Sequence, residues 1–184
     1  KAMKYVGAEV EVTSEAARIA KADKVILPGV GAFGDCMLNL EKYGLVPVIK
    51  ETLASEKPFL GICLGLQLLF EGSEEAPGIQ GLGFFKGQVE KIKTDLKVPH
   101  MGWNSLILKT PSPLLAKAAE GYVYFVHSFH AVPEDKSIIT AVCNYGTEVT
   151  AAVGRANVQA VQFHPEKSSK VGLGILQSFK EWQL

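Results

Sequence analysis

Cys63 lies in the pentapeptide Gly61-Ile62-Cys63-Leu64-Gly65, which has the form of a nucleophile elbow with cysteine in place of serine. A sharp strand-to-helix turn forces the central residue into strained dihedrals, and the two flanking glycines give it room. The thiol would stand at the carboxyl end of a strand and at a helix N-terminus, whose partial positive charge favours a thiolate. Most free cysteines are small buried apolar residues, but the flanking glycines favour a nucleophile here.

A nucleophilic cysteine needs a base, and His164 is the best placed of the four histidines. It follows an apolar strand pattern and precedes Pro165, which fixes a turn that brings Glu166 back toward the imidazole. We therefore predict a triad in which Cys63 is the nucleophile, His164 is the base and Glu166 orients the base.

The other three histidines point to no separate chemistry. His127 and His130 are three residues apart, but no third metal ligand is evident and this spacing on a strand puts them on opposite faces. We interpret them as structural or substrate-lining, and the role of His100 stays open. The sequence calls for no metal and no cofactor.

Acyl transfer also needs donors for the developing oxyanion. The loop Pro28-Gly29-Val30-Gly31 follows a short apolar strand, and its glycines would let the amides of Val30 and Gly31 turn toward a ligand. The amide of Leu64 would be the second donor. An ordinary strand-to-helix loop remains the alternative for the first segment.

The composition is that of a globular domain. The chain has 184 residues, 47% of them hydrophobic, and its 19 Lys and Arg balance 19 Asp and Glu. This balance argues against nucleic acid or a membrane surface as a partner, and the longest apolar run is too short to cross a bilayer. Three cysteines without metal-ligand spacing suit a reducing cytoplasm.

The spacing of apolar residues predicts one α/β domain over residues 1–184. The first 70 residues alternate strands with helices: strands at 8–12, 25–27 and 58–62, and helices from Ser14 as N-cap to Ala22, over 32–53 with interruptions at Gly44 and Pro47, and over 64–70. The second half predicts strands at 87–92, 105–109, 122–126, 138–144, 147–154 and 158–163, then a helix over 168–182. We expect a mixed, mainly parallel, flavodoxin-like central sheet flanked by helices, with a smaller antiparallel sheet in the second half.

Two segments resemble the triad-type, class I glutamine amidotransferases: Gly61-Ile62-Cys63-Leu64-Gly65-Leu66-Gln67 and Phe163-His164-Pro165-Glu166. Four further segments are similar to the glutaminase subunits of imidazole glycerol phosphate synthases, from histidine biosynthesis. They are Pro28 to Asp35, His100-Met101-Gly102-Trp103-Asn104, Tyr124 to Ser128 and His164 to Ser168. The resemblance covers nearly the whole chain.

This resemblance implies that Cys63 attacks the glutamine carboxamide, that His164 protonates the departing ammonia, and that water then releases glutamate from a thioester. It also implies that Gln67, Glu75, Ser128 and Phe129 bind the amino-acid end of glutamine. Gln67 on a helix surface, and Glu75 in a solvated acidic loop, are the alternatives.

The implied partner is a (β/α)8-barrel cyclase subunit in a heterodimer. It would join the ammonia to a phosphoribosyl-formimino substrate and form imidazole glycerol phosphate and an aminoimidazole carboxamide ribonucleotide. The implied interface residues are His100, Met101, Trp103, Asn104 and Lys167, although a tryptophan is more often part of the core. A cysteine hydrolase or peptidase acting alone, an amidotransferase serving another synthase, and a non-catalytic binding module remain alternatives.

The family's opening strand has no counterpart at the start of this sequence. Residues 1–7 are typical of the last turns of a helix that a glycine stops at Gly7. We therefore expect about 20 residues, with the first strand, to precede Lys1.

Overall fold

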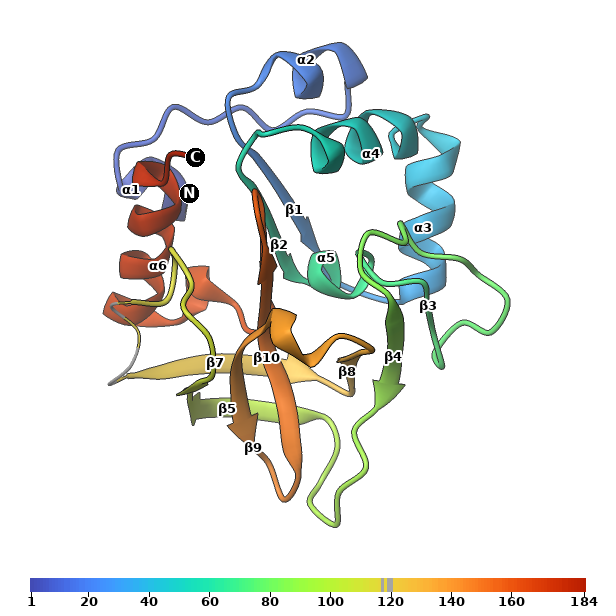
Figure 1. Cartoon of the computed structure of the whole chain (residues 1–184), viewed down its shortest axis with the longest axis vertical. Coiled ribbons are helices and arrows are strands. Elements are labelled where there is room, and N and C mark those ends of the chain that lie inside the picture. Colours follow the sequence, from blue (N-terminus) through green and yellow to red (C-terminus); the bar gives the residue numbers. More distant parts are fainter. Residues whose placement is uncertain (117, 119–120) are drawn as a thin grey trace.

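A six-stranded mixed sheet forms the centre of the protein in the computed structural model, which describes residues 1–116, 118 and 121–184 (Figure 1). The strand order is β1-β2-β11-β10-β9-β6. The strands are β1 (Val25–Gly29), β2 (Phe59–Cys63), β11 (Val158–Val161), β10 (Glu148–Arg155), β9 (Ile139–Asn144) and β6 (Ile107–Leu108). β2 pairs in parallel with β1 and β11, and the other pairs are antiparallel. The predicted mixed sheet is confirmed.

The inner parallel strands, β2 and β11, are buried on both faces. Every residue of β2 and β11 is buried, as expected for strands covered by helices on both sides. Successive residues of β2 point to opposite faces, so Phe59 packs in one apolar cluster, whereas Leu60 and Ile62 pack in the other. β1 is an edge strand whose partner in the sheet is β2.

Helices cover the two faces, with α3 and α4 on one side and α1 and α6 on the other (Figure 1). The helices are α1 (Ala2–Tyr5), α2 (Ala16–Lys21), α3 (Phe33–Lys42), α4 (Val46–Ala54), α5 (Leu64–Gln67) and α6 (Ser169–Glu181). The predicted break at Gly44 separates α3 from α4, and Pro47 lies in the first turn of α4. Over the part of the chain that the structure describes, no helix has the length and apolar character needed to span a membrane.

Two smaller sheets lie beyond the carboxyl ends of β1 and β2. One joins β3 (Gly72–Ser73), β4 (Gly87–Lys91) and β8 (Phe129–Pro133), and the other pairs β5 (His100–Ser105) with β7 (Tyr122–His127) in antiparallel register. The 3₁₀ turns are η1 (Lys136–Ile138) and η2 (Pro165–Lys167). The expected antiparallel sheet in the second half is confirmed. β5 and β8 were not predicted.

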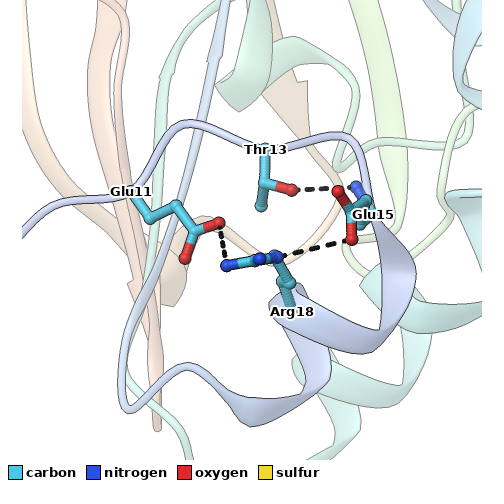
Figure 2. A network of polar contacts seen from close by, with 4 residues as sticks. All are labelled: Glu11, Thr13, Glu15 and Arg18. Atoms are coloured by element: carbon cyan, nitrogen blue, oxygen red, sulfur yellow. Dashed lines mark hydrogen bonds and ion pairs between the residues drawn. The ribbon is translucent and has the colours of Figure 1, made fainter.

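The beginning of the chain differs from the prediction. Residues 8–12 form no strand, and Val12 is 96% exposed. The N-cap of α2 is Glu15 rather than Ser14, and its backbone N–H binds Thr13 Oγ1. Figure 2 shows the surface network around this turn, in which Arg18 pairs with Glu11 and with Glu15. Exposed ion pairs of this kind add little stability.

The helix end predicted at Gly7 is confirmed. α1 ends at Tyr5, and Gly7 has a φ of 77°, in the left-handed region that favours glycine. Its backbone N–H donates to the Lys4 carbonyl, which closes the last turn.

Candidate active site

The backbone at Cys63 has the strained geometry that the elbow pattern predicts. Cys63 has φ 54° and ψ −110°, a conformation rare for a residue with a side chain. Gly61 and Gly65 have no side chains, which lets the backbone of the turn pack closely against neighbouring backbone atoms. A Cβ on Gly65 would lie 1.8 Å from the Leu27 carbonyl oxygen, and one on Gly61 would lie 2.8 Å from the Gly65 carbonyl oxygen. The helix that follows, α5, ends at Gln67 and is therefore shorter than the predicted helix over residues 64–70.

His164 is held in place by its backbone and by one ring nitrogen. It lies three residues after the end of β11 as the N-cap of η2, and its N–H donates to the Tyr124 carbonyl. The ring is 3% exposed, and its Nδ1 lies 2.7 Å from Glu166 Oε1. The turn through Pro165 brings the carboxylate back onto the imidazole as predicted.

The other ring nitrogen of His164, Nε2, is buried and has no hydrogen bond of ordinary geometry to the described residues. The Cys63 sulfur is nevertheless close enough to be the main influence on the pKa of His164, which rises to about 9. The hydrogen bond to Glu166 raises this pKa further, while burial lowers it. The arrangement therefore favours an imidazolium between a sulfur and a carboxylate.

Glu166 is suited to remain ionised. Burial alone would raise the pKa of its carboxyl, but the hydrogen bond from His164, its own backbone N–H and the charges of His164 and Lys167 lower the pKa below its usual value. A carboxylate that stays charged can hold the imidazole in one orientation.

The loop after β1 lies at the same edge of the sheet as Cys63. Gly29 is the register partner of Cys63 across the β1–β2 pair, so Val30 and Gly31 follow beside the nucleophile. A Cβ on Gly29 would lie 2.9 Å from the Leu64 Cβ, which shows how closely the loop packs on the elbow. Gly31 has a φ of 95° and Val30 is 78% exposed. The two predicted sources of oxyanion donors are therefore neighbours.

Gln67 is buried and anchored, so it is not a residue of a helix surface. Its Nε2 lies 3.0 Å from the Phe129 carbonyl oxygen and 3.0 Å from Gln162 Oε1. Gln162 Nε2 in turn lies 3.7 Å from the Cys63 Sγ. Gln162 was not predicted as a site residue, although an amide inside the apolar run before His164 is a signal that could mark it.

Glu75 lies in an exposed loop but is engaged rather than free in solvent. Its Oε2 accepts a hydrogen bond of 2.8 Å from the Phe33 N–H at the start of α3. The contact ties this loop to the segment that follows Gly31. Ser128 joins β7 to β8, and its carbonyl accepts from the Ile92 N–H.

Of the remaining histidines, His100 and His127 form a buried polar pair, and His130 lies apart from them. His100 Nδ1 lies 3.1 Å from His127 Nε2, and His127 Nδ1 lies 2.8 Å from the Phe129 carbonyl oxygen. Burial lowers the pKa of His100 to about 4 and that of His127 to about 3, so both are neutral near pH 7. His130 is on β8 and accepts from the Thr150 N–H. Among the described residues no cluster of three metal-binding side chains is present.

Four of the five predicted interface residues lie at or near the surface of the β5–β7 sheet. Met101 is 61% and Trp103 53% exposed, and the Trp103 ring centroid is 6.0 Å from that of Tyr124. Asn104 is half-buried, and Lys167 Nζ lies 5.8 Å from the Tyr124 centroid. His100 differs, because it is 2% exposed and stacked between Phe125 and Tyr145. In this conformation it lies beneath the surface that it was predicted to form.

Comparisons with known proteins agree on one family. The family model described as glutamine amidotransferase class-I matches residues 1–180. A relative from Syntrophotalea carbinolica is 50% identical over 187 residues, covering 97% of this chain and 91% of the relative. One from Aquifex aeolicus is 50% identical over 182 residues, covering 98% and 88%. Both are named imidazole glycerol phosphate synthase subunit HisH.

Solved structures support the fold. One titled as a crystal structure of a glutamine amidotransferase matches 98% of this chain and 91% of its own length, with a TM-score of 0.76 and 17% identity. The structure of PurLQS from Thermotoga maritima matches 85% and 78%, with a TM-score of 0.64 and 21% identity.

Proposed function

Because the chain belongs to the class I glutamine amidotransferases, we propose that it is the glutaminase subunit of an imidazole glycerol phosphate synthase. It would hydrolyse glutamine to glutamate and ammonia and deliver the ammonia to a (β/α)8-barrel cyclase. The observation that carries the chemistry is the pairing of the buried His164 with the Glu166 carboxylate, after a strand, β11, that lies beside the strand of Cys63. The two relatives that share half of their residues with this chain support the assignment to this synthase.

The first half-reaction forms a thioester. The Cys63 thiolate adds to the carboxamide carbon of glutamine, and the amides of Leu64 and of the loop at Val30 and Gly31 stabilise the oxyanion. As the tetrahedral intermediate collapses, its C–N bond breaks and the His164 imidazolium donates a proton to the leaving nitrogen. Ammonia departs, and a glutamyl thioester and a neutral imidazole remain.

The second half-reaction restores the site. Neutral His164 takes a proton from water, and the resulting hydroxide equivalent attacks the thioester carbon. The C–S bond breaks, and Cys63 is again a thiolate beside an imidazolium. The new carboxyl group gives its proton to water, and glutamate leaves. Glu166 keeps the ring in one orientation through both steps.

The pocket for the amino-acid end of glutamine would be formed by Gln67, Glu75, Ser128 and Phe129. The carbonyl of Phe129 already accepts from Gln67 and from His127. This double contact fixes the turn between β7 and β8, from which main-chain groups would meet the substrate carboxylate. The other carboxylate oxygen of Glu75 would meet the ammonium, since Oε2 is held by the Phe33 N–H.

The partner would dock on the β5–β7 sheet. Met101 and Trp103 give it an exposed apolar surface, and Lys167 adds a charge at its border. A central exposed aromatic residue is a common anchor of protein interfaces. The surface also connects with the site, because β7 supplies the carbonyl that fixes the His164 backbone.

A glutaminase assay with and without the barrel cyclase tests the proposal. We expect ammonia release that depends on glutamine, and a rate that rises when the cyclase and its ligand are present. We expect this rise for two reasons. Cys63 is only 7% exposed, and the loop at Gly29 to Gly31 would turn an amide toward the oxyanion only in the complex with the cyclase. One oxyanion donor contributes about 10²–10³ in rate. A chain that hydrolyses glutamine at its full rate alone contradicts this coupling, and a chain inactive in both settings contradicts the function.

A further inference from the structure

Gln162 is a buried amide that has no part in the triad. It directly follows β11, its side chain has no exposed surface, and its Nε2 lies 3.7 Å from the Cys63 Sγ. We propose that Gln162 is the hydrogen-bond donor that stabilises the Cys63 thiolate, and that the Phe129 carbonyl fixes the direction of its amide through Gln67. This inference rests on the proposed function only in naming Cys63 as the nucleophile.

The direction of the Gln162 amide follows from a single carbonyl. The Phe129 oxygen can only accept, so Gln67, whose amide lies 3.0 Å away, must present its NH2 group there. The same NH2 group lies 3.0 Å from one end of the Gln162 amide, which must therefore be the oxygen. The NH2 group of Gln162 is then the end that faces Cys63.

The opposite orientation is unfavourable in a buried site. Exchanging the amide oxygen and nitrogen of Gln162 would place its NH2 group against that of Gln67. Exchanging them in both residues would bring the Gln67 oxygen against the Phe129 oxygen. His127 reinforces the arrangement, since its Nδ1 also donates to the Phe129 carbonyl. Burial makes such mismatches costly, because no solvent can replace the lost hydrogen bonds.

A donor in this position acts differently on the two forms of the sulfur. A thiol is a weak acceptor, whereas hydrogen bonds to an ionised group are shorter and about twice as strong. The Gln162 NH2 group therefore favours the thiolate over the thiol. The strained backbone of Cys63 limits where the sulfur can go, so a rigid donor can remain aimed at it.

The pH dependence of Cys63 alkylation by iodoacetamide, followed by peptide mass spectrometry, tests the proposal on the full chain. In Gln162→Met, which keeps the length of the side chain and removes the donor, we expect the midpoint of alkylation to rise by about one pH unit, and the rate at neutral pH to fall about tenfold. Gln162→Asn keeps an amide but shortens its reach, and the same shift is expected. It provides the test if circular dichroism shows that the Met variant is unfolded.

Gln159→Met is the matched control. Gln159 is on β11 and is also buried, but its Oε1 accepts from Ser112 Oγ. We expect its Cys63 profile to match the wild type. Alkylation of Cys36 and Cys143 in the same digest reports any general loosening of the fold.

Glutaminase measurements separate a donor from a structural residue. If Gln162 acts on the thiolate, raising the pH within the range where His164 stays protonated restores much of the lost kcat in the variants, whereas KM changes little. An unchanged alkylation midpoint in a folded variant overturns the inference even when the wild type hydrolyses glutamine. If the wild type shows no glutaminase activity with the cyclase but the midpoint still shifts, the proposed function fails and the inference about the sulfur stands.

Discussion

His100 donates through Nδ1 to His127 Nε2 across 3.1 Å inside the protein. The direction follows from Phe129, whose carbonyl accepts from His127 Nδ1 and so leaves Nε2 of the neutral ring as an acceptor. His100 Nε2 is then the acceptor that faces Asn104 Nδ2 at 3.4 Å. A polarised chain of hydrogen bonds thus joins β5, on the predicted partner surface, to the carbonyl that anchors Gln67.

Acid should weaken the fold through this histidine pair. The folded protein holds the pKa of His100 near 4 and that of His127 near 3, whereas an unfolded chain titrates near 6.5. Below pH 6.5 the two histidines therefore bind protons in the unfolded state but stay neutral in the folded state. The free energy of unfolding falls as the pH drops toward 4. Urea unfolding of His127→Gln at several pH values should show a slope smaller by up to about 1.4 kcal/mol per pH unit. Equal slopes in the variant and the wild type would exclude this origin.

Replacing the nucleophile should remove catalysis but not the fold. Cys63→Ala should reduce ammonia release to background, a loss on the order of 10⁶ by analogy with nucleophile removal in other triads. Affinity for the cyclase should stay within a few-fold, because Cys63 is only 7% exposed and is not one of the predicted interface residues. Cys36→Ala and Cys143→Ala are the controls, since burial raises the pKa of both thiols, that of Cys143 to about 12. Turnover near that of the wild type in Cys63→Ala would point to another nucleophile.

Removing the charge at Glu166 should shift the alkaline limit of activity. Glu166→Gln should lower kcat by about 10²–10⁴. After Cys63, Glu166 is the next influence that raises the pKa of His164 to about 9, so this pKa should fall in the variant. His164 must be protonated to donate a proton to the leaving nitrogen, so activity is lost as the pH rises through its pKa. The variant should therefore lose activity at lower pH. A pH profile of kcat checks the shift. A drop in rate with an unmoved alkaline limb would mean that Glu166 has no charge effect on His164.

The exposed tryptophan should matter for the partner and not for the fold. Trp103→Ala should weaken binding of the barrel cyclase of a related synthase about 10- to 100-fold, as expected for an interface anchor. Tyr43→Ala is the matched control, because Tyr43 is 61% exposed but follows α3 on another part of the surface. Calorimetric titration measures both. Equal affinities would place the interface elsewhere.

The elements around the triad follow local rules, which is why the sequence predicts them well. Gly61 and Gly65 indicate the strained turn at Cys63, and Pro165 indicates the return of Glu166. Strand β2 is an uninterrupted apolar run, the pattern typical of a strand buried on both faces.

What escaped prediction depends on contacts distant in the sequence. β5 contains His100, Gly102 and Asn104, and becomes a strand because it pairs with β7. In the sequence, Gln162 is only a polar residue within an apolar run. Its role depends on its contacts with Gln67 and Cys63, which are distant in the sequence. Val12 belongs to a pattern that alternates like a strand, but residues 8–12 pair with no strand among the described residues. The spacing of apolar residues describes a single segment, whereas these features depend on contacts between two segments.

The position of β11 between β2 and β10 has a consequence for synthesis on the ribosome. β2 carries the nucleophile, yet its parallel neighbour, which leads into the base, follows roughly a hundred residues later. The nascent chain therefore carries a finished elbow with one open strand edge while most of the protein is still being translated. His164 and Glu166 follow β11 in the sequence, so the catalytic residues can meet only after that strand has been synthesised. We therefore expect nascent chains that end before Glu166 to release no ammonia.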